Sequence, residues 1–330
     1  MTIRNLALAT ALIATLAAPA RAQVTAFDLV NEYPATSLPG EADVFFAEAV
    51  RRATDGRVVI RPVPDAKSGL RSRDQLAAVA DGRVAMADTF GGALADESPA
   101  FLLSSLPFAT NSTANARKLY DIARPLYEKV FATRKQKLLY VTPWPPTGLW
   151  SSVPINDGDA LKSLKIRTYD KTSTDVFSRL VAAAAIVSFA DLNAKLESGE
   201  INAVLSSGDG GAGRALWKYT RYFSQINYAV PLSFTAISRT AWDGLDEASR
   251  KAIEQAARET TEHGWDAMAG RVAENFGRMR ENGVVIDQYP PAVVMGPLRD
   301  AAAASIADWR IRAGPGARQA LDDYRATLPQ

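Results

Sequence analysis

The sequence predicts an α/β protein of two lobes, in which each lobe is a mostly parallel sheet flanked by helices and one long helix bridges the lobes. In the first half of the chain, short β-branched runs alternate with helical stretches, and this βαβαβ order is typical of a mostly parallel sheet. A chain of 330 residues is also large enough for its core to divide into two lobes. The cleft between lobes is a common place for a ligand.

The first lobe is expected to begin with three strands separated by two helices. We place the strands at residues 27–30, 58–61 and 84–88 and the helices at 41–54 and 73–81. Asn111 or Ser112 caps a further helix that runs to residue 133, because apolar residues recur there at three-to-four spacing. Pro125 is expected to kink this helix, and a strand follows at 138–141.

The Pro-rich segment 142–148 is expected to lack regular structure and to mark the first crossing between lobes. The second lobe then contains strands at 165–168 and 201–205 and helices at 174–184 and 191–196. A continuous helical pattern covers residues 246–281 and stops at Gly283, which predicts a helix of about 50 Å that spans both lobes. The predicted boundaries are 23–145 with about 232–270 for the first lobe and 146–231 with about 271–330 for the second.

Residues 1–22 have the pattern of a secretory signal peptide. Arg4 supplies the positive start, an apolar run follows, and small residues flank a cleavage point that would leave Gln23 as the mature N-terminus. Because the apolar run is shorter than a spanning helix needs, we expect a soluble, exported, periplasmic protein. Removal of Arg4 and Arg21 reduces 38 basic residues to 36, which equals the number of acidic residues. This balance gives no electrostatic footprint for nucleic acid.

The scarcity of histidine and cysteine excludes most familiar catalytic machinery. With no cysteine and only His263, the chain cannot build thiol nucleophiles, His-based triads, the usual zinc sites or iron–sulfur clusters. A carboxylate pair or a Ser-Lys dyad is not excluded by counting, but no spacing singles one out. We therefore expect no enzyme activity, no metal and no cofactor, and we interpret His263 as structural.

Arg167 is the candidate ligand-binding residue because it ends a short strand directly before a helix. A guanidinium binds a carboxylate through two parallel hydrogen bonds, and the free amides of a helix start favour the same charge. The alternative is that Arg167 lies at the surface and pairs with a nearby acid such as Asp170 or Asp175.

Several segments, in the right order, resemble the solute-binding subunits of tripartite ATP-independent periplasmic (TRAP) transporters of the DctP type. The segment 159–167, which ends in Leu-Lys-Ile-Arg, is the strongest match. The others are residues 46–58, 76–87, 105–108 (Ser-Leu-Pro-Phe) and 189–203. The resemblance covers residues 22 to about 284.

This resemblance implies a two-lobed clamshell of the periplasmic binding protein kind, which captures a small organic acid without turnover. It implies that Arg167 grips the carboxylate and that the membrane permease subunits of the transporter are the partner. We expect a monomer. The alternatives are a binding protein of an ABC importer, which should lack the long bridging helix, or a periplasmic enzyme, which needs titratable groups in the cleft.

Departures from the family pattern predict an apolar pocket around a single arginine. Trp150 lies near the place where members that bind sugar acids often carry a second arginine, and Phe90 and Ala93 lie where charged residues can occur. A monocarboxylate with an aromatic or branched body would suit such a pocket. The aromatic candidates, each of which core packing would also explain, are Trp144, Trp150, Phe90, Tyr169 and Phe189.

Further candidates follow strand ends. Ser206 and Ser207 begin a Gly-rich loop that can present hydroxyls and amides to a ligand, although such a loop is also typical of a flexible turn. Glu32 or Tyr33 lies where the first strand ends. Tyr228 and Phe234 lie where the chain returns between the lobes.

Overall fold

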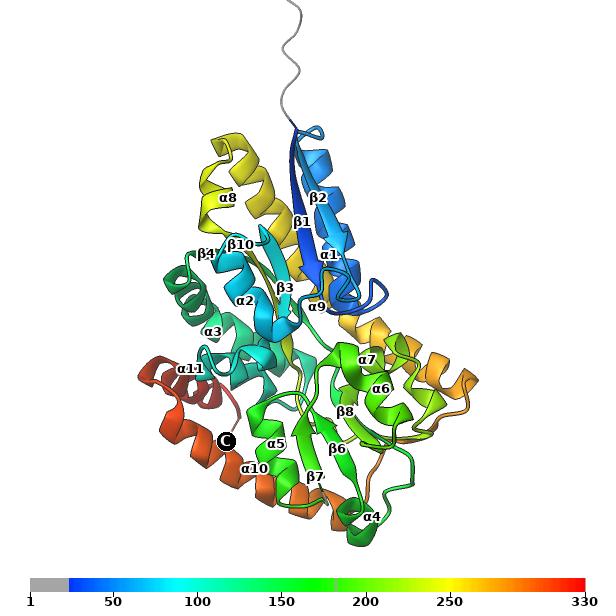
Figure 1. The fold of residues 1–330 in the computed structure, drawn as a ribbon. Coiled ribbons are helices and arrows are strands. Elements are labelled where there is room, and N and C mark those ends of the chain that lie inside the picture. Colours follow the sequence, from blue (N-terminus) through cyan, green and yellow to red (C-terminus); the bar gives the residue numbers. More distant parts are fainter. Residues whose placement is uncertain (1–23, 182, 330) are drawn as a thin grey trace, which may run out of the picture.

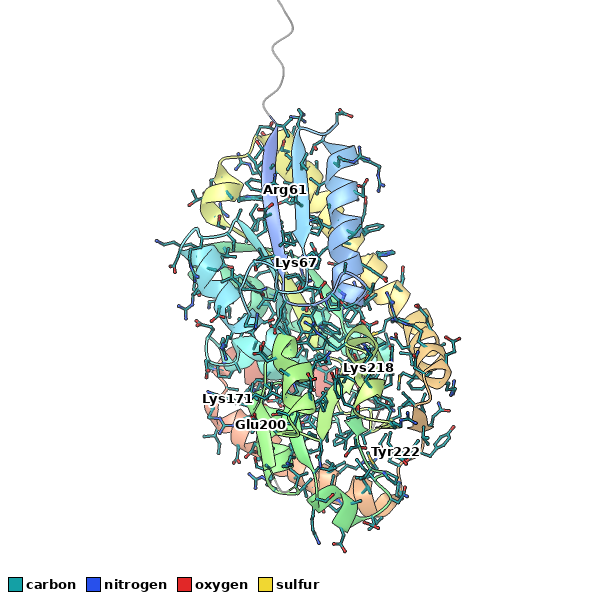
Figure 2. The ribbon with its side chains drawn as sticks, turned by 45° about the vertical axis from the view of Figure 1, so that its right-hand side comes forward. Arg61, Lys67, Lys171, Glu200, Lys218 and Tyr222 are labelled. Atoms are coloured by element: carbon teal, nitrogen blue, oxygen red, sulfur yellow. The ribbon has the colours of Figure 1, made fainter. Side chains whose placement is uncertain are left out.

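The computed structural model describes residues 24–181 and 183–329, and its strands form two separate sheets (Figure 1). The predicted signal peptide lies outside the described residues. The first sheet lies in the upper part of Figure 1, which we call the first body, and the second sheet lies in the lower part, the second body. The two bodies correspond to the two predicted lobes. Figure 2 shows Arg61 and Lys67 on the upper body and Glu200, Lys218 and Tyr222 on the lower one.

The first sheet has the strand order β2-β1-β3-β10-β4. Strands β1, β2 and β3 are parallel, and β10 runs antiparallel to both of its neighbours. The sheet is therefore mostly parallel, as predicted. Its strands are β1 (Thr25–Asn31), β2 (Val58–Val63), β3 (Met86–Phe90), β4 (Gln136–Pro143) and β10 (Leu232–Ser238).

The second sheet has the order β11-β9-β5-β8-β6-β7, and β5 alone is antiparallel to its neighbours β8 and β9. Its strands are β5 (Thr147–Ser151), β6 (Lys165–Thr168), β7 (Ala183–Ile186), β8 (Ala203–Ser207), β9 (Tyr222–Ser224) and β11 (Val285–Asp287).

Helices flank both sheets. In the first half they are α1 (Leu38–Ala53), α2 (Ser72–Ala80), the short η1 (Gly91–Leu94) and η2 (Pro99–Ser105), and α3 (Thr113–Thr133), which Ser112 caps and which contains Pro125. In the second half they are α4 (Gly158–Lys162), α5 (Lys171–Ser178), η3 (Phe189–Asp191), α6 (Leu192–Glu197), α7 (Gly208–Gly213), η4 (Leu216–Lys218), α8 (Arg239–Asp243), α9 (Glu247–Glu281), α10 (Ala292–Arg312) and α11 (Pro315–Ala326).

Helix α9 connects the two bodies, as the sequence predicted. It is 35 residues long, begins at the Asp246 cap and ends before Gly283, whose φ of 77° suits glycine. It packs on α1 and β4 in the first body and on α7 and β11 in the second. At the middle of α9, Gly264 lies against Thr142 and Pro143, and a larger side chain at this position would contact both residues.

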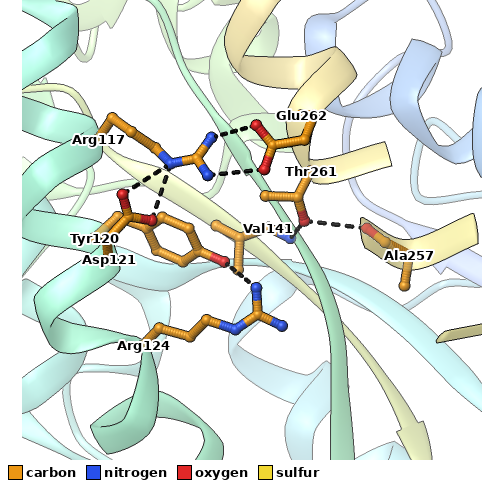
Figure 3. A network of polar contacts seen from close by, with 8 residues as sticks. All are labelled: Arg117, Tyr120, Asp121, Arg124, Val141, Ala257, Thr261 and Glu262. Atoms are coloured by element: carbon orange, nitrogen blue, oxygen red, sulfur yellow. Dashed lines mark hydrogen bonds and ion pairs between the residues drawn. The ribbon is translucent and has the colours of Figure 1, made fainter. Parts of the chain in front are cut away.

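Polar contacts fix α9 to α3 in the first body (Figure 3). The Arg117 guanidinium donates to both Glu262 carboxylate oxygens, at 2.8 and 3.0 Å, and to Asp121 on its own helix at 2.9 Å. These contacts raise the pKa of Arg117, chiefly through its hydrogen bond to Glu262. Thr261 also accepts from the backbone amide of Val141 on β4, which places the helix directly on the sheet.

Three local predictions were wrong. The Pro-rich segment does contain regular structure: β4 runs to Pro143, and the Trp144 and Thr147 amides donate to the returning chain at Pro231 and Ala229. The helix expected at 174–184 begins and ends earlier, as α5, and residues 183–186 form β7 beside β6.

The third wrong prediction concerns the C-terminus, which we expected to belong wholly to the second lobe. Helix α10 packs on α5 of the second body, whereas α11 packs on α3 and η2 of the first. The reason is the apolar face of α11, which joins the first body's core beside Tyr127 and Phe131 through Ala317, Ala320, Leu321 and Tyr324.

The Trp150 side chain sets how closely α7 approaches the second sheet. It is fully buried on β5, packs edge-on against Phe223 at 5.2 Å between ring centroids, and donates from Nε1 to the Ser207 carbonyl at 3.2 Å. A Cβ at Gly211 would lie 2.1 Å from the indole ring. Only glycine fits there.

We predict that Gly211→Ala lowers the free energy of unfolding by about 1–3 kcal/mol, because the added methyl group overpacks the contact with Trp150. Gly270→Ala is the matched control, since that glycine lies on an exposed turn of α9 with open space around it. It should raise stability by about 0.5–1 kcal/mol. Urea unfolding of both variants measures the difference, and equal effects would contradict this packing.

Candidate functional site

A cavity lies between the two sheets, at the carboxyl ends of strands from both bodies. Its empty volume is about 310 Å³, open space at its mouth included. Eight of the nine predicted pocket residues lie there together, and only Trp150 does not. The lining residues are Tyr33, Phe90, Trp144, Thr147, Arg167, Tyr169, Phe189, Ser206, Ser207, Gly210 and Pro231.

Arg167 is presented from the end of β6 into this cavity. Its Nε donates to the Val187 carbonyl and its NH1 to the Leu205 carbonyl, each at 2.9 Å. Because these two bonds leave further guanidinium N–H groups, the side chain is held in place and still has donors for a ligand. Arg167 is 4% exposed, and its burial lowers the pKa of the guanidinium.

No carboxylate among the described residues forms an ion pair with Arg167. Asp170 instead caps α5, where it accepts from the Ser173 amide at 2.7 Å, and Asp175 pairs with Arg179. The alternative of a surface arginine neutralised by these acids is therefore wrong. A buried cation without a counter-charge is costly, and an anionic ligand is the natural group to neutralise it.

Aromatic rings from both bodies surround the arginine. The Tyr33 ring lies 4.4 Å from Phe189, 4.6 Å from Trp144 and 6.1 Å from Phe90, measured between centroids. Tyr169 meets Phe90 edge-on at 5.4 Å, and its ring centre is 5.9 Å from the Arg167 guanidinium carbon. The cavity thus has apolar walls around one positive charge.

Ser206 and Ser207 bring hydroxyls to the cavity from the end of β8. Ser207 accepts from the Gly210 amide at 3.1 Å, which turns the chain into α7. A Cβ at Gly210 would lie 2.5 Å from the Ser206 hydroxyl, so glycine keeps this wall open.

Thr147, Gly210 and Pro231 also line the cavity but were not predicted as site residues. Thr147 and Pro231 lie on two segments of the chain that cross between the bodies. Backbone hydrogen bonds between these two segments bring both residues to the cavity. That pairing is set by the tertiary fold, and local sequence carries no signal for it.

Three candidates do not line the cavity. Trp150 is on the opposite face of β5 from Thr147, because side chains alternate along a strand, and it packs in the second body's core. Phe234 lies in the first body's core against Phe101 and Tyr127, and Tyr228 packs on Phe177. The prediction that Trp150 lines the pocket is wrong for this reason.

A wider cavity, with an empty volume of about 840 Å³ that includes open solvent, continues from the first one toward the mouth between the bodies. Five residues, among them Arg167 and Phe189, line both. The outer lining adds Glu32, Arg71, Ser72, Arg73, Gly92, Ala93, Ala95, Asp96, Lys171, Ile186, Val187 and Ser188. Glu32 and Ala93, which the sequence pointed to, thus lie at the mouth; the charged residues beside them were missed.

The described part of the chain offers no group of three or more histidine or acidic side chains that could hold a metal ion. His263 lies outside the cavity on α9, where its ring stacks on Phe45 at 4.2 Å between centroids. Among residues 24–181 and 183–329, no helix has the length and apolar character needed to span a membrane.

Two sheet-based bodies, a helix that joins them and a buried cation in the cavity between them define the class of bacterial solute-binding proteins. Comparison with known families identifies which one. Residues 29–308 match the model of the bacterial extracellular solute-binding proteins, family 7 (DctP), and the chain belongs to this family. This match supports the predicted solute-binding protein of a TRAP transporter over the alternative of a binding protein of an ABC importer. It is a family of transport receptors.

Known relatives match more than nine-tenths of this chain. A solute-binding protein of Roseobacter denitrificans is 23% identical over 93% of this chain and 94% of its own length. The structure is similar to that of the DctP7 receptor of Bordetella pertussis, which binds pyroglutamic acid: the TM-score is 0.88 at 25% identity, over 92% of this chain and all of the other. A marine metagenome TRAP protein specific for pyroglutamate has a TM-score of 0.86, again at 25% identity over 92% of this chain and all of that one.

Proposed function

We propose that this protein captures a compact organic monocarboxylate in the periplasm and delivers it to the membrane subunits of a TRAP transporter. The observation that carries the proposal is Arg167, a buried cation with free N–H donors in the cavity between the two bodies. Export rests on the signal-peptide pattern of residues 1–22 and on the family. We infer a carrier that releases its ligand unchanged.

The lining of the inner cavity supports a ligand with one negative charge and a small ring or branched body. Arg167 is the single cation among the described lining residues, and no acid lines the cavity beside it. Five aromatic rings favour an apolar body, and Ser206, Ser207 and Thr147 offer hydrogen bonds for one or two polar atoms. Pyroglutamate, the ligand of relatives at 25–26% identity, has these properties.

Ligand binding would stabilise the closed arrangement because the cavity draws its walls from both bodies. Glu32 of the first body accepts from the Ser188 hydroxyl and from the Ala190 amide, at 3.0 Å, in the second. Arg71 pairs with Asp191 at 2.9 Å across the same mouth. A ligand that contacts both bodies shifts the population toward this closed state by its difference in affinity for the two states.

Arg167→Ala tests the proposal directly. We expect the affinity for pyroglutamate to fall by about 2–5 kcal/mol, at least about 30-fold in Kd, because the ligand carboxylate would be buried without its partner. Lys171→Met is the matched control, since Lys171 is an exposed cation of the mouth that pairs with Asp96; its loss should cost less than about 1 kcal/mol. Calorimetric titration measures both, and equal small losses would contradict the role of Arg167.

A thermal-shift screen tests the ligand class. Pyroglutamate at 100 times its Kd should stabilise the protein by about 2.7 kcal/mol. Its neutral analogue 2-pyrrolidinone should give no shift, because it cannot neutralise Arg167, and succinate should give little, because its second carboxylate finds no cation. A larger shift with glucuronate than with pyroglutamate would exclude the apolar pocket while leaving the family unchanged.

Ser188→Ala should accelerate ligand release. The substitution removes a hydrogen bond to the Glu32 carboxylate that exists only when the bodies are closed, at an expected cost of about 1–2 kcal/mol in the closed state. The dissociation rate should rise about tenfold while the association rate is unchanged. Ser198→Ala, whose hydroxyl bonds within its own body, is the control. Stopped-flow kinetics measure both rates, and an unchanged dissociation rate in Ser188→Ala would contradict this role.

A further inference from the structure

A row of polar side chains crosses the first sheet one pleat behind the ligand cavity. In the strand register, Asn31 lies beside Asp88, Asp88 beside Thr235, and Thr235 beside Tyr140. All four are about 1% exposed. Because alternate residues of a strand share one face, the next position of β3 on this face is Phe90, which lines the cavity.

Asp43 of α1 covers this row. Its carboxylate accepts from the Tyr140 hydroxyl at 2.6 Å and from the Asn31 amide at 2.7 Å, and the same amide reaches Asp88 at 3.4 Å. Neither Asp43 nor Asp88 has an ion-pair partner in the described residues, and Asp88 Oδ1 has no hydrogen-bond partner there. Two buried carboxyl groups therefore lie side by side without a counter-charge.

Burial raises the pKa of Asp43 to about 6, and burial together with the neighbouring Asp43 raises the pKa of Asp88 well above its usual value. Two adjacent buried carboxylates cannot both ionise near neutral pH without a large cost. The other titratable groups that face the pair are Tyr140 on β4 and Tyr33 after β1, and burial raises the pKa of both phenols.

No other charge reaches the pair from the elements packed around it, within the described ranges. On α9, Arg271 pairs with Glu41, and His263 stacks on Phe45. Helix α2 packs on the opposite face of the sheet, where it meets Val30 and Ala87, so its charged residues lie on the other side.

Residues of this face also hydrogen-bond to two residues that line the cavity, Tyr33 and Trp144. The Asn31 side-chain oxygen accepts from the Tyr33 backbone amide at 2.8 Å, which fixes the chain where β1 ends. On β10, the next residue of the same face is Ser233, whose hydroxyl accepts from Trp144 Nε1 at 3.1 Å. Ser233 lies two residues from Thr235, the cross-strand neighbour of Asp88.

We propose that Asp43 and Asp88 share one bound proton, and that this proton positions Tyr33 and Trp144 as walls of the ligand cavity. Loss of the proton leaves two buried negative charges, which repel each other and displace the Asn31 and Ser233 side chains. The pair is a positioning device, because neither carboxyl group lines the cavity. The inference rests on the proposed function in one respect, because it treats Tyr33 and Trp144 as residues that contact the ligand.

Stability should therefore fall as pH rises. Above about pH 4 an unfolded aspartate has lost its proton, whereas the folded pair keeps one until the pH passes its own raised pKa. The folded state binds more protons in this interval, so its free energy of unfolding decreases with increasing pH. Asp88→Asn keeps the shape of the side chain, removes one of the two titrating carboxyl groups and should make this slope shallower.

The first measurement compares melting temperatures of ligand-free protein between pH 5 and 9. Relative to Asp88→Asn, the unmodified protein should lose several degrees as pH rises; parallel curves would overturn the proposal. Asp28→Asn, which removes an exposed carboxylate paired with Arg61, is the control and should keep the slope. If Asp88→Asn does not fold, Asp43→Asn replaces it, and the infrared band of a protonated carboxyl group in the unmodified protein gives the same decision.

The second measurement follows Trp144 fluorescence, taken as the difference between the protein and its Trp144→Phe variant. It should change with the same midpoint as the stability curve and stay constant in Asp88→Asn; a signal independent of pH would overturn the positioning role. Both measurements use ligand-free protein, so a failure of pyroglutamate to bind would count against the proposed function and not against the shared proton.

Discussion

Arg167 carries a positive charge into the interior of the protein, and no carboxylate of the described residues forms an ion pair with it. Two backbone carbonyls hold the guanidinium, which fixes its direction while leaving N–H donors for another molecule. A group of this kind is unfavourable in a closed interior and favourable beside an anion. The aromatic walls, the narrow cavity and the contacts across its mouth all act around this one charge.

The fold delivers this arrangement by joining strand ends from two sheets. Tyr33 and Phe90 come from the first sheet and Arg167 and Ser206 from the second, so the cavity exists only where the bodies meet. Helix α9 spans both bodies and is fixed to the first by Arg117, Glu262 and Thr261.

Helix α9 and much of the cavity lining could be predicted from the sequence, because they depend on local sequence patterns. Hydrophobic periodicity located α9, the strand before Arg167 located the cation, and departures from the family pattern pointed to several of its aromatic neighbours. The predictions that failed depend on which face of a strand or helix meets the rest of the fold. Trp150 faces away from the cavity because of strand alternation within β5, and α11 returns to the first body because its apolar face fits the core beside Tyr127. The Asp43 and Asp88 pair needs the register of four strands, which no local pattern reveals.

The most direct test of the central claim is a crystal structure of the mature protein with pyroglutamate bound. We expect the ligand between the two bodies, with its carboxylate within hydrogen-bond distance of the Arg167 guanidinium and its ring against Tyr33, Phe189 and Trp144. A ligand whose carboxylate is bound by other groups, with Arg167 directed at protein or solvent alone, would contradict the account.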